Sequence, residues 1–229
     1  MNPSVAERLA SIERRVAAAC LRAHRDPREV TLVGAGKRQS EERLEAACRA
    51  GLRNIGENVV QEAEAHRALL SRSGRDLTWH LIGPLQSNKV RKAVALFDFV
   101  HSIDRLKIAR KLSAEAARSD RRLRGFLEIN LGMEESKHGF APEELADALT
   151  EIAELENLEI LGLMAIPPVA DSEADARGWF RRLRGLRDRF LPQGGSLSMG
   201  MSADFEIAIE EGATHVRVGS ALFGPRAPQ

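Results

Sequence analysis

The sequence predicts an α/β protein, a single-domain (β/α)₈ TIM barrel with an extra helix at its N-terminus. The chain has 229 residues, which is at the small end for such a barrel and enough for one well-packed core. Short apolar runs alternate with longer helix-patterned stretches in eight β-then-α units of about 28 residues, close to the unit length of a ~250-residue barrel. No Gly/Ser-rich linker or block of like charge divides the chain. We therefore expect one domain over residues 1–229.

The elements begin with an amphipathic helix, because Val5, Leu9, Ile12 and Val16 recur at helical spacing. Eight apolar runs after it are the strand candidates: 30–36, 53–57, 78–83, 97–103, 125–131, 158–166, 196–200 and 214–219. A doubly wound open sheet is the alternative architecture, but it normally has fewer strands.

The stretches between these strands carry helix signals. In the first of them, 40–50, Ser40 can cap the helix, and Leu44, Ala47 and Cys48 share one face. Helical patterns also follow the fourth, fifth and sixth strands, at 103–112, 141–155 and 172–190. The alternation of strand and helix therefore continues to the C-terminus.

Composition excludes several classes of function. With 34 Lys+Arg against 33 Asp+Glu, the net charge of +1 argues against a nucleic-acid or acidic-membrane partner. No apolar run approaches ~18 residues, and acidic residues stand where a signal peptide would be apolar, so we expect a cytoplasmic protein. Cys20 and Cys48 have no spacing typical of a disulfide framework or a zinc site. The chain has no Tyr, so a reaction that needs a phenol base cannot occur within it.

The lysines are few enough to place individually: Lys37, Lys89, Lys92, Lys107, Lys111 and Lys137. Four of them fall on predicted helices and are most simply surface charges, while Lys137 lies in the loop after the fifth strand, near Glu134 and Glu135. Lys37 directly follows the apolar first strand, where partial desolvation favours the neutral amine that a Schiff base requires. A strand-end lysine that reaches solvent is the alternative interpretation.

The GAGK sequence around Lys37 does not fit a nucleotide motif. A Walker loop requires glycine where Thr31 stands and Ser or Thr where Arg38 stands. The dinucleotide fingerprint requires a third glycine where Gln39 stands. Neither type of nucleotide site is predicted.

The last two β-to-α loops predict a phosphate site. Ser202 can cap a helix after the seventh strand, and Gly219 and Ser220 open a short helix after the eighth. Free amide groups at helix N-termini suit an anion, and barrels commonly bind phosphate with these two loops.

Other polar residues fall on or near strand ends. Arg217 alternates with two valines and is expected to point into the barrel, with an ion pair to an acid such as Glu128 as its structural explanation. His80 and His101 are most simply hydrogen-bonded barrel histidines, and no metal-ligand spacing is present. Asn58 can cap the helix that follows or contact a ligand.

Five motifs carry a resemblance to a known family: GENVVQE (56–62), WHLIGPLQSNKVRK (79–92), HSID (101–104), LSMGMSADFEIAI (197–209) and RVGSALFG (217–224). Over roughly residues 30–226 the chain resembles the pyridoxal 5′-phosphate (PLP) homeostasis proteins. That family resembles the barrel domain of alanine racemases but has no second, β-rich domain.

The resemblance implies a cofactor site for PLP. It implies that Lys37 forms the aldimine (Schiff base), that Ser202, Gly219 and Ser220 hold the phosphate, and that Arg217 faces the pyridine nitrogen. It also implies that Asn58 and His80 lie beside the ring. The chain departs from the family pattern at Gly36, Arg38 and Val59, where Ser, Thr and Tyr are usual.

The resemblance and the missing Tyr together predict a carrier or buffer of PLP without robust turnover, with PLP-dependent apo-enzymes as partners and a monomer as the default state. An amino-acid racemase using Lys37 and His80 is the alternative, and solvent deuterium exchange at the substrate α-carbon would distinguish it. A Schiff-base aldolase acting on a sugar phosphate is the third hypothesis. It predicts trapping by a phosphosugar without added cofactor.

Overall fold

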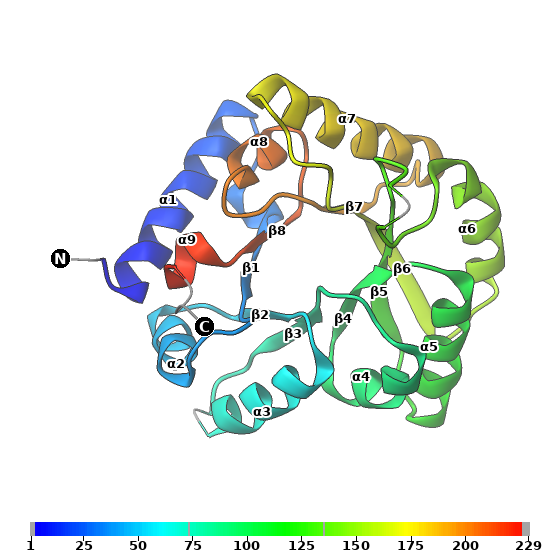
Figure 1. Ribbon diagram of the computed structural model, residues 1–229, viewed down its shortest axis with the longest axis horizontal. Coiled ribbons are helices and arrows are strands. Elements are labelled where there is room, and N and C mark those ends of the chain that lie inside the picture. The colour runs from blue at the N-terminus through cyan, green and yellow to red at the C-terminus, as the bar shows by residue number, and fades with distance from the viewer. Residues whose placement is uncertain (1–2, 73, 135, 226–229) are drawn as a thin grey trace.

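The computed structural model describes residues 3–72, 74–134 and 136–225, and within them eight parallel strands close into a barrel (Figure 1). The strands are β1 (Thr31–Ala35), β2 (Asn54–Glu57), β3 (Thr78–Leu81), β4 (Phe99–Ile103), β5 (Leu123–Glu128), β6 (Leu158–Met164), β7 (Ser196–Ser198) and β8 (His215–Val218). Each strand pairs with its neighbours in sequence, and β8 returns to pair with β1. The predicted barrel is confirmed, and the open sheet is wrong.

Helices surround the strands, as Figure 1 shows. They are α1 (Val5–Arg22), α2 (Glu41–Ala50), α3 (Val60–Ser71), α4 (Val90–Leu96), α5 (Leu106–Arg118), α6 (Leu145–Ala153), α7 (Glu173–Phe190), α8 (Phe205–Glu210) and α9 (Ser220–Phe223), with 3₁₀ turns at Pro27–Glu29, Ser87–Lys89 and Pro142–Glu144. The helix after β8 has only four residues and cannot cover the barrel wall by itself. The N-terminal helix α1 packs against α2, α8 and α9 and covers this part of the wall.

The packing of α1 follows from its sequence. Its apolar positions, including Leu9, Ile12 and Val16, are buried against the barrel. Arg15 forms an ion pair of 2.6 Å with Glu206 of α8 and lies 4.5 Å from the centre of the Phe205 ring. The helix predicted as an addition to the barrel is thus part of its outer layer.

Apolar side chains from strands and helices form one continuous core around the barrel wall. Because all strands run in the same direction, the loops that follow them gather at one end of the barrel, here called the mouth. In the described part of the chain, no helix combines the length and apolar character needed to cross a membrane.

Candidate functional site

A cavity of about 340 Å³ opens at the mouth, between the loops that follow β1, β2, β7 and β8. We call it the Lys37–Arg217 cavity. Six of the seven residues for which the sequence predicted contact with a cofactor line it: Lys37, Asn58, Ser202, Arg217, Gly219 and Ser220. The seventh, His80, is absent from the lining.

Lys37 lies two residues beyond the end of β1, in a turn that a buried carboxylate constrains. The Gly36 amide donates a 2.8 Å hydrogen bond to the Gly56 carbonyl of β2. A Cβ atom at Gly36 would lie 2.3 Å from Oε1 of Glu57, so the buried carboxylate occupies the space of a side chain there. Arg38 then adopts a positive φ of 56°, which only a minority of non-glycine residues adopt. Two of the three departures from the family pattern therefore lie in one tight turn.

Glu57 itself belongs to a buried pair that the sequence reasoning missed. Its Oε1 accepts a 2.8 Å hydrogen bond from Nδ1 of His66 on α3, and its Oε2 has no hydrogen-bond partner among the described residues. Burial raises the pKa of Glu57, and the hydrogen bond to Glu57 raises the pKa of His66. An acid in an otherwise buried strand was the available signal. Its partner is nine residues away and could not be assigned from spacing.

At the phosphate end, Ser202 has a different role from the predicted one. Helix α8 begins at Phe205 with Asp204 in the capping position, so the prediction that Ser202 caps it is wrong. The Ser202 hydroxyl instead accepts hydrogen bonds from the amides of Gly219 (3.1 Å) and Ala221 (3.2 Å). The hydroxyl therefore joins the last two β-to-α loops directly. Because α8 and α9 have six and four residues, individual amides rather than a long helix dipole would bind an anion here.

Arg217 is buried at the inner end of the same cavity. Its guanidinium donates to the Ser198 carbonyl (2.8 Å), the Ser198 hydroxyl (2.6 Å) and the Ala165 carbonyl (3.0 Å), and Nε–H takes part in no hydrogen bond among the described residues. The expected ion pair with Glu128 is not formed, and the guanidinium donates to neutral oxygens instead. Burial lowers the pKa of Arg217 to about 10, so the side chain stays charged at neutral pH.

A chain of hydrogen bonds leads from Arg217 into the barrel interior. Ser198 Oγ lies 2.7 Å from His101 Nδ1, His101 Nε2 lies 2.9 Å from His80 Nδ1, and His80 Nε2 lies 3.1 Å from Asn54 Oδ1. Because arginine can only donate, the Ser198 hydroxyl donates onward, and each ring then accepts at Nδ1 and donates at Nε2. Both histidines are therefore neutral. We call these five residues the Arg217–Asn54 chain.

The lowered pKa values of the two histidines agree with this direction of hydrogen bonding, in which both rings are neutral. Burial lowers the pKa of His80 to about 3 and places the pKa of His101 well below its usual range. His80 is 1% exposed and stacks on Phe99, with ring centres 4.7 Å apart. The interpretation as hydrogen-bonded barrel histidines is confirmed. The expectation that His80 lies beside a ligand is not supported by the cavity lining.

Two further predictions concern Lys137 and Asn58. Lys137 Nζ forms an ion pair of 2.6 Å with Glu134, while Glu135, the other predicted partner, lies outside the described residues. Asn58 does not cap α3, whose capping position is Val59, and Asn58 lines the cavity instead. Among the described residues, no group of His, Cys, Asp and Glu is arranged to hold a metal ion.

Comparisons with known proteins agree with this geometry. The family described as "Alanine racemase, N-terminal domain" matches residues 10–227. The chain is 43% identical over 223 residues to the pyridoxal phosphate homeostasis protein of Pseudomonas aeruginosa, covering 97% of this chain and 96% of that one. It is 42% identical to the protein of the same name from Aquifex aeolicus, covering 96% and 97%.

Solved structures extend the comparison. PipY of Synechococcus elongatus, solved with PLP bound, is 37% identical and superposes with a TM-score of 0.83 over 96% of this chain and 100% of its own. An alanine racemase of Clostridium difficile is 17% identical with a TM-score of 0.72, covering 95% of this chain and 57% of the racemase. At that identity, the racemase shares the fold alone.

Proposed function

This chain belongs to the pyridoxal phosphate homeostasis protein family, and we propose that it binds PLP covalently at Lys37 and carries or buffers it within the cell. The observation that carries the proposal is the Lys37–Arg217 cavity. It brings Lys37, which follows β1, together with the buried Arg217 and the backbone amides of the last two β-to-α loops. We also propose that residues 1–229 form one PLP-binding domain.

Each of the predicted site residues has a part in this proposal. Lys37 supplies the amine for the Schiff base, and Ser202, Gly219 and Ser220 surround the phosphate with a hydroxyl and amides. Arg217 meets the pyridine nitrogen, for which its Nε–H is available. Asn58 flanks the ring. His80 would not touch the cofactor and would act indirectly, by holding the Arg217–Asn54 chain in place.

The same residues account for the absence of robust turnover in the proposal. PLP supplies a ring that can accept electrons from a bound amino acid, and a protonated pyridine nitrogen strengthens this effect. A charged Arg217 at that nitrogen disfavours its protonation. Racemization also needs a second base, but the chain has no Tyr, and His80 is buried and neutral. The curated relatives are likewise named homeostasis proteins.

We propose PLP-dependent apo-enzymes as recipients, because the mouth carries exposed apolar side chains around the cavity. Five of the six large apolar side chains that the described residues leave exposed lie in loops at this end: Val59, Met133, Ile166, Val169 and Met201. A monomer is consistent with a closed barrel, which has no free strand edge for pairing between copies. The buried free thiols of Cys20 and Cys48 suit the reducing cytoplasm.

Absorbance titration with PLP, followed by borohydride reduction, tests the proposal. The wild type should develop an imine band near ~420 nm that reduction removes, leaving PLP covalently attached to a peptide containing Lys37. Lys37→Ala should lose both, while Lys137→Ala should retain both because that lysine is paired with Glu134. An unchanged band and labelled peptide pattern in Lys37→Ala would overturn the assignment.

A further inference from the structure

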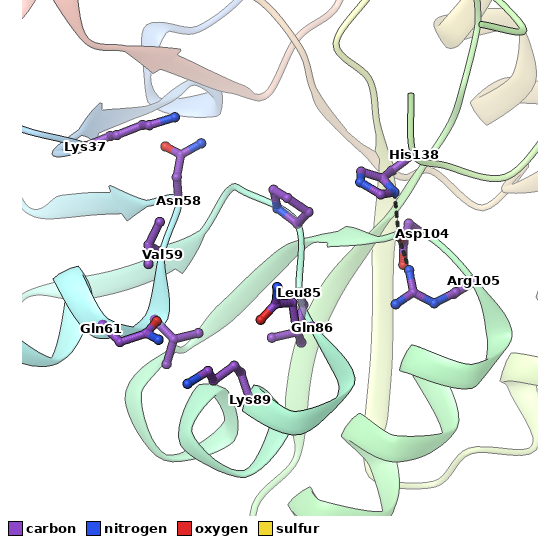
Figure 2. Close-up of a pocket in the computed structure, with 12 residues that line it drawn as sticks. Lys37, Asn58, Val59, Gln61, Leu85, Gln86, Lys89, Asp104, Arg105 and His138 are labelled. Carbon is purple, nitrogen blue, oxygen red and sulfur yellow. Dashed lines mark hydrogen bonds and ion pairs between the residues drawn. The ribbon is translucent and has the colours of Figure 1, made fainter. Parts of the chain in front are cut away.

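A second cavity, of about 560 Å³, shares Lys37 and Asn58 with the first and lies between the loops that follow β2, β3, β4 and β5. We call it the Lys37–Lys89 cavity. Figure 2 shows Lys37 at one side of it, Lys89 at the bottom of the view and Asp104 with Arg105 at the opposite side. Its size is within the range of small-molecule sites. None of the residues assigned to PLP, other than these two shared ones, lines it.

The charges around this cavity do not balance. The buried Asp104 carboxylate pairs with the Arg105 guanidinium and lies 3.5 Å from Nδ1 of His138. Lys37 and Lys89 form no ion pair with any described residue. Once Lys37 is committed to the cofactor, Lys89 remains as an unmatched positive charge, half-buried in the cavity wall.

Lys92 lies three residues later and does have an acidic partner, so the absence of an ion pair between Lys89 and the described residues follows from where Lys89 lies. Lys92 Nζ forms an ion pair of 2.7 Å with Glu64 on the neighbouring helix. Lys89 stands at the end of the 3₁₀ turn that opens α4 and faces the cavity together with the amide side chains of Gln61 and Gln86. These groups provide hydrogen-bond donors next to a single unmatched cation, which together suit one carboxylate.

We propose that the Lys37–Lys89 cavity admits a primary amine that also carries a carboxylate, such as a free α-amino acid, with its carboxylate on Lys89. Its amine would then lie on the Lys37 side and release the cofactor by imine exchange. This inference rests on the proposed function, because it explains how a cofactor held at Lys37 can leave.

The exchange needs no further reagent. The incoming neutral amine attacks the imine carbon, the C–N bond to Lys37 Nζ breaks, and a new C=N bond forms to the incoming nitrogen. The imine is protonated before and after the exchange, so one proton passes from the incoming nitrogen to Lys37 Nζ, which leaves as a neutral primary amine. No electrons are gained or lost overall. Lys89 takes no part in the bond changes and acts by positioning the amine.

The test measures release of PLP from loaded protein by alanine, by ethylamine, which lacks the carboxylate, and by propionate, which lacks the amine. We expect alanine to release PLP at a tenfold or more lower concentration than ethylamine, and propionate to release none. Lys89→Gln should reduce the alanine-to-ethylamine ratio at least fivefold, while Lys92→Gln should leave it unchanged. Comparing this ratio between variants cancels the different basicities of the two amines.

A second readout does not use the cofactor. In the PLP-free protein, propionate should shift the side-chain amide NMR signals of Gln61 and Gln86, and Lys89→Gln should abolish these shifts. Failure to load PLP on Lys37 would refute the proposed function. Normal loading, with the alanine-to-ethylamine ratio unaffected by Lys89→Gln, would overturn this inference alone.

Discussion

The interior of the barrel and its mouth hold their polar groups in opposite ways. In the interior, the Arg217–Asn54 chain gives each of its five side chains at least one partner within the protein. At the mouth, Lys37 and Lys89 line cavities without an ion pair to any described residue. A buried polar group without a partner is costly, whereas a group at an open cavity can remain hydrated until a ligand arrives. We therefore expect interior substitutions to reduce stability and mouth substitutions to reduce binding.

The largest effect on stability should come from Arg217→Met. This change removes the donor to two buried carbonyls and to the Ser198 hydroxyl, which should lower the free energy of unfolding by about 3 kcal/mol. Urea denaturation measures the change. Arg181→Met, at an exposed arginine that pairs with Glu211, is the control and should cost no more than ~1 kcal/mol. Equal losses in the two variants would contradict the expectation that the buried hydrogen bonds of Arg217 support the fold more than an exposed ion pair does.

The next prediction concerns the pH dependence of the interior. Burial holds the pKa of His80 at about 3 against an ordinary value of 6.5, so unfolding takes up a proton between these values. The stability from this residue is complete above pH 6.5 and is lost as the pH falls toward 3. In His80→Gln, the slope of unfolding free energy against pH should be smaller by up to ~1.4 kcal/mol per pH unit in this window. If the unfolding free energies of the wild type and His80→Gln change with pH at the same rate in this window, the lowered pKa of His80 is refuted.

For Glu128, at the mouth end of β5, the contribution to stability should depend on pH in the opposite direction. Burial, together with repulsion from Asp104, raises its pKa from 4.5 to about 7. The folded protein therefore holds a proton that the unfolded chain has lost, and this stabilisation is present below pH 4.5 and lost as the pH rises through 7. Glu128→Gln should be more stable than the wild type above pH 7, by roughly 1–2 kcal/mol since the side chain is only partly buried, and the advantage should vanish near pH 4.5.

The smallest effects on stability are expected for the mouth lysines. Lys37→Ala and Lys137→Ala should each change the free energy of unfolding by less than ~1 kcal/mol, because neither supports a buried partner and the Lys137 pair is partly exposed. Thermal denaturation of the PLP-free proteins measures both. A large loss in Lys37→Ala would mean that this lysine serves the fold as well as the ligand.

Local sequence patterns predicted most of the fold and part of the site. Each apolar run became a strand, although the fifth begins at Leu123 rather than residue 125, because the charged Arg124 interrupts the apolar pattern. Residues at strand ends were correctly brought to one cavity, since parallel strands end together. Contacts across the barrel could not be predicted. The bonds of Arg217 to Ser198, at the end of β7, and to Ala165, directly after β6, join residues 19 and 52 positions apart.

The position of α1 has a consequence for how the protein is made. The Arg15–Glu206 pair joins residues 191 positions apart, so the part of the α1 surface that packs on α8 and α9 has no partner until those two helices leave the ribosome. At ordinary rates of translation, this delay is roughly 10–40 s. During that time this apolar surface of α1 stays exposed. A nascent chain that pauses before β8 would therefore present a binding site to chaperones that recognise apolar segments. Helix α1 is thus among the last elements to complete its contacts, although it precedes every strand of the barrel in the sequence.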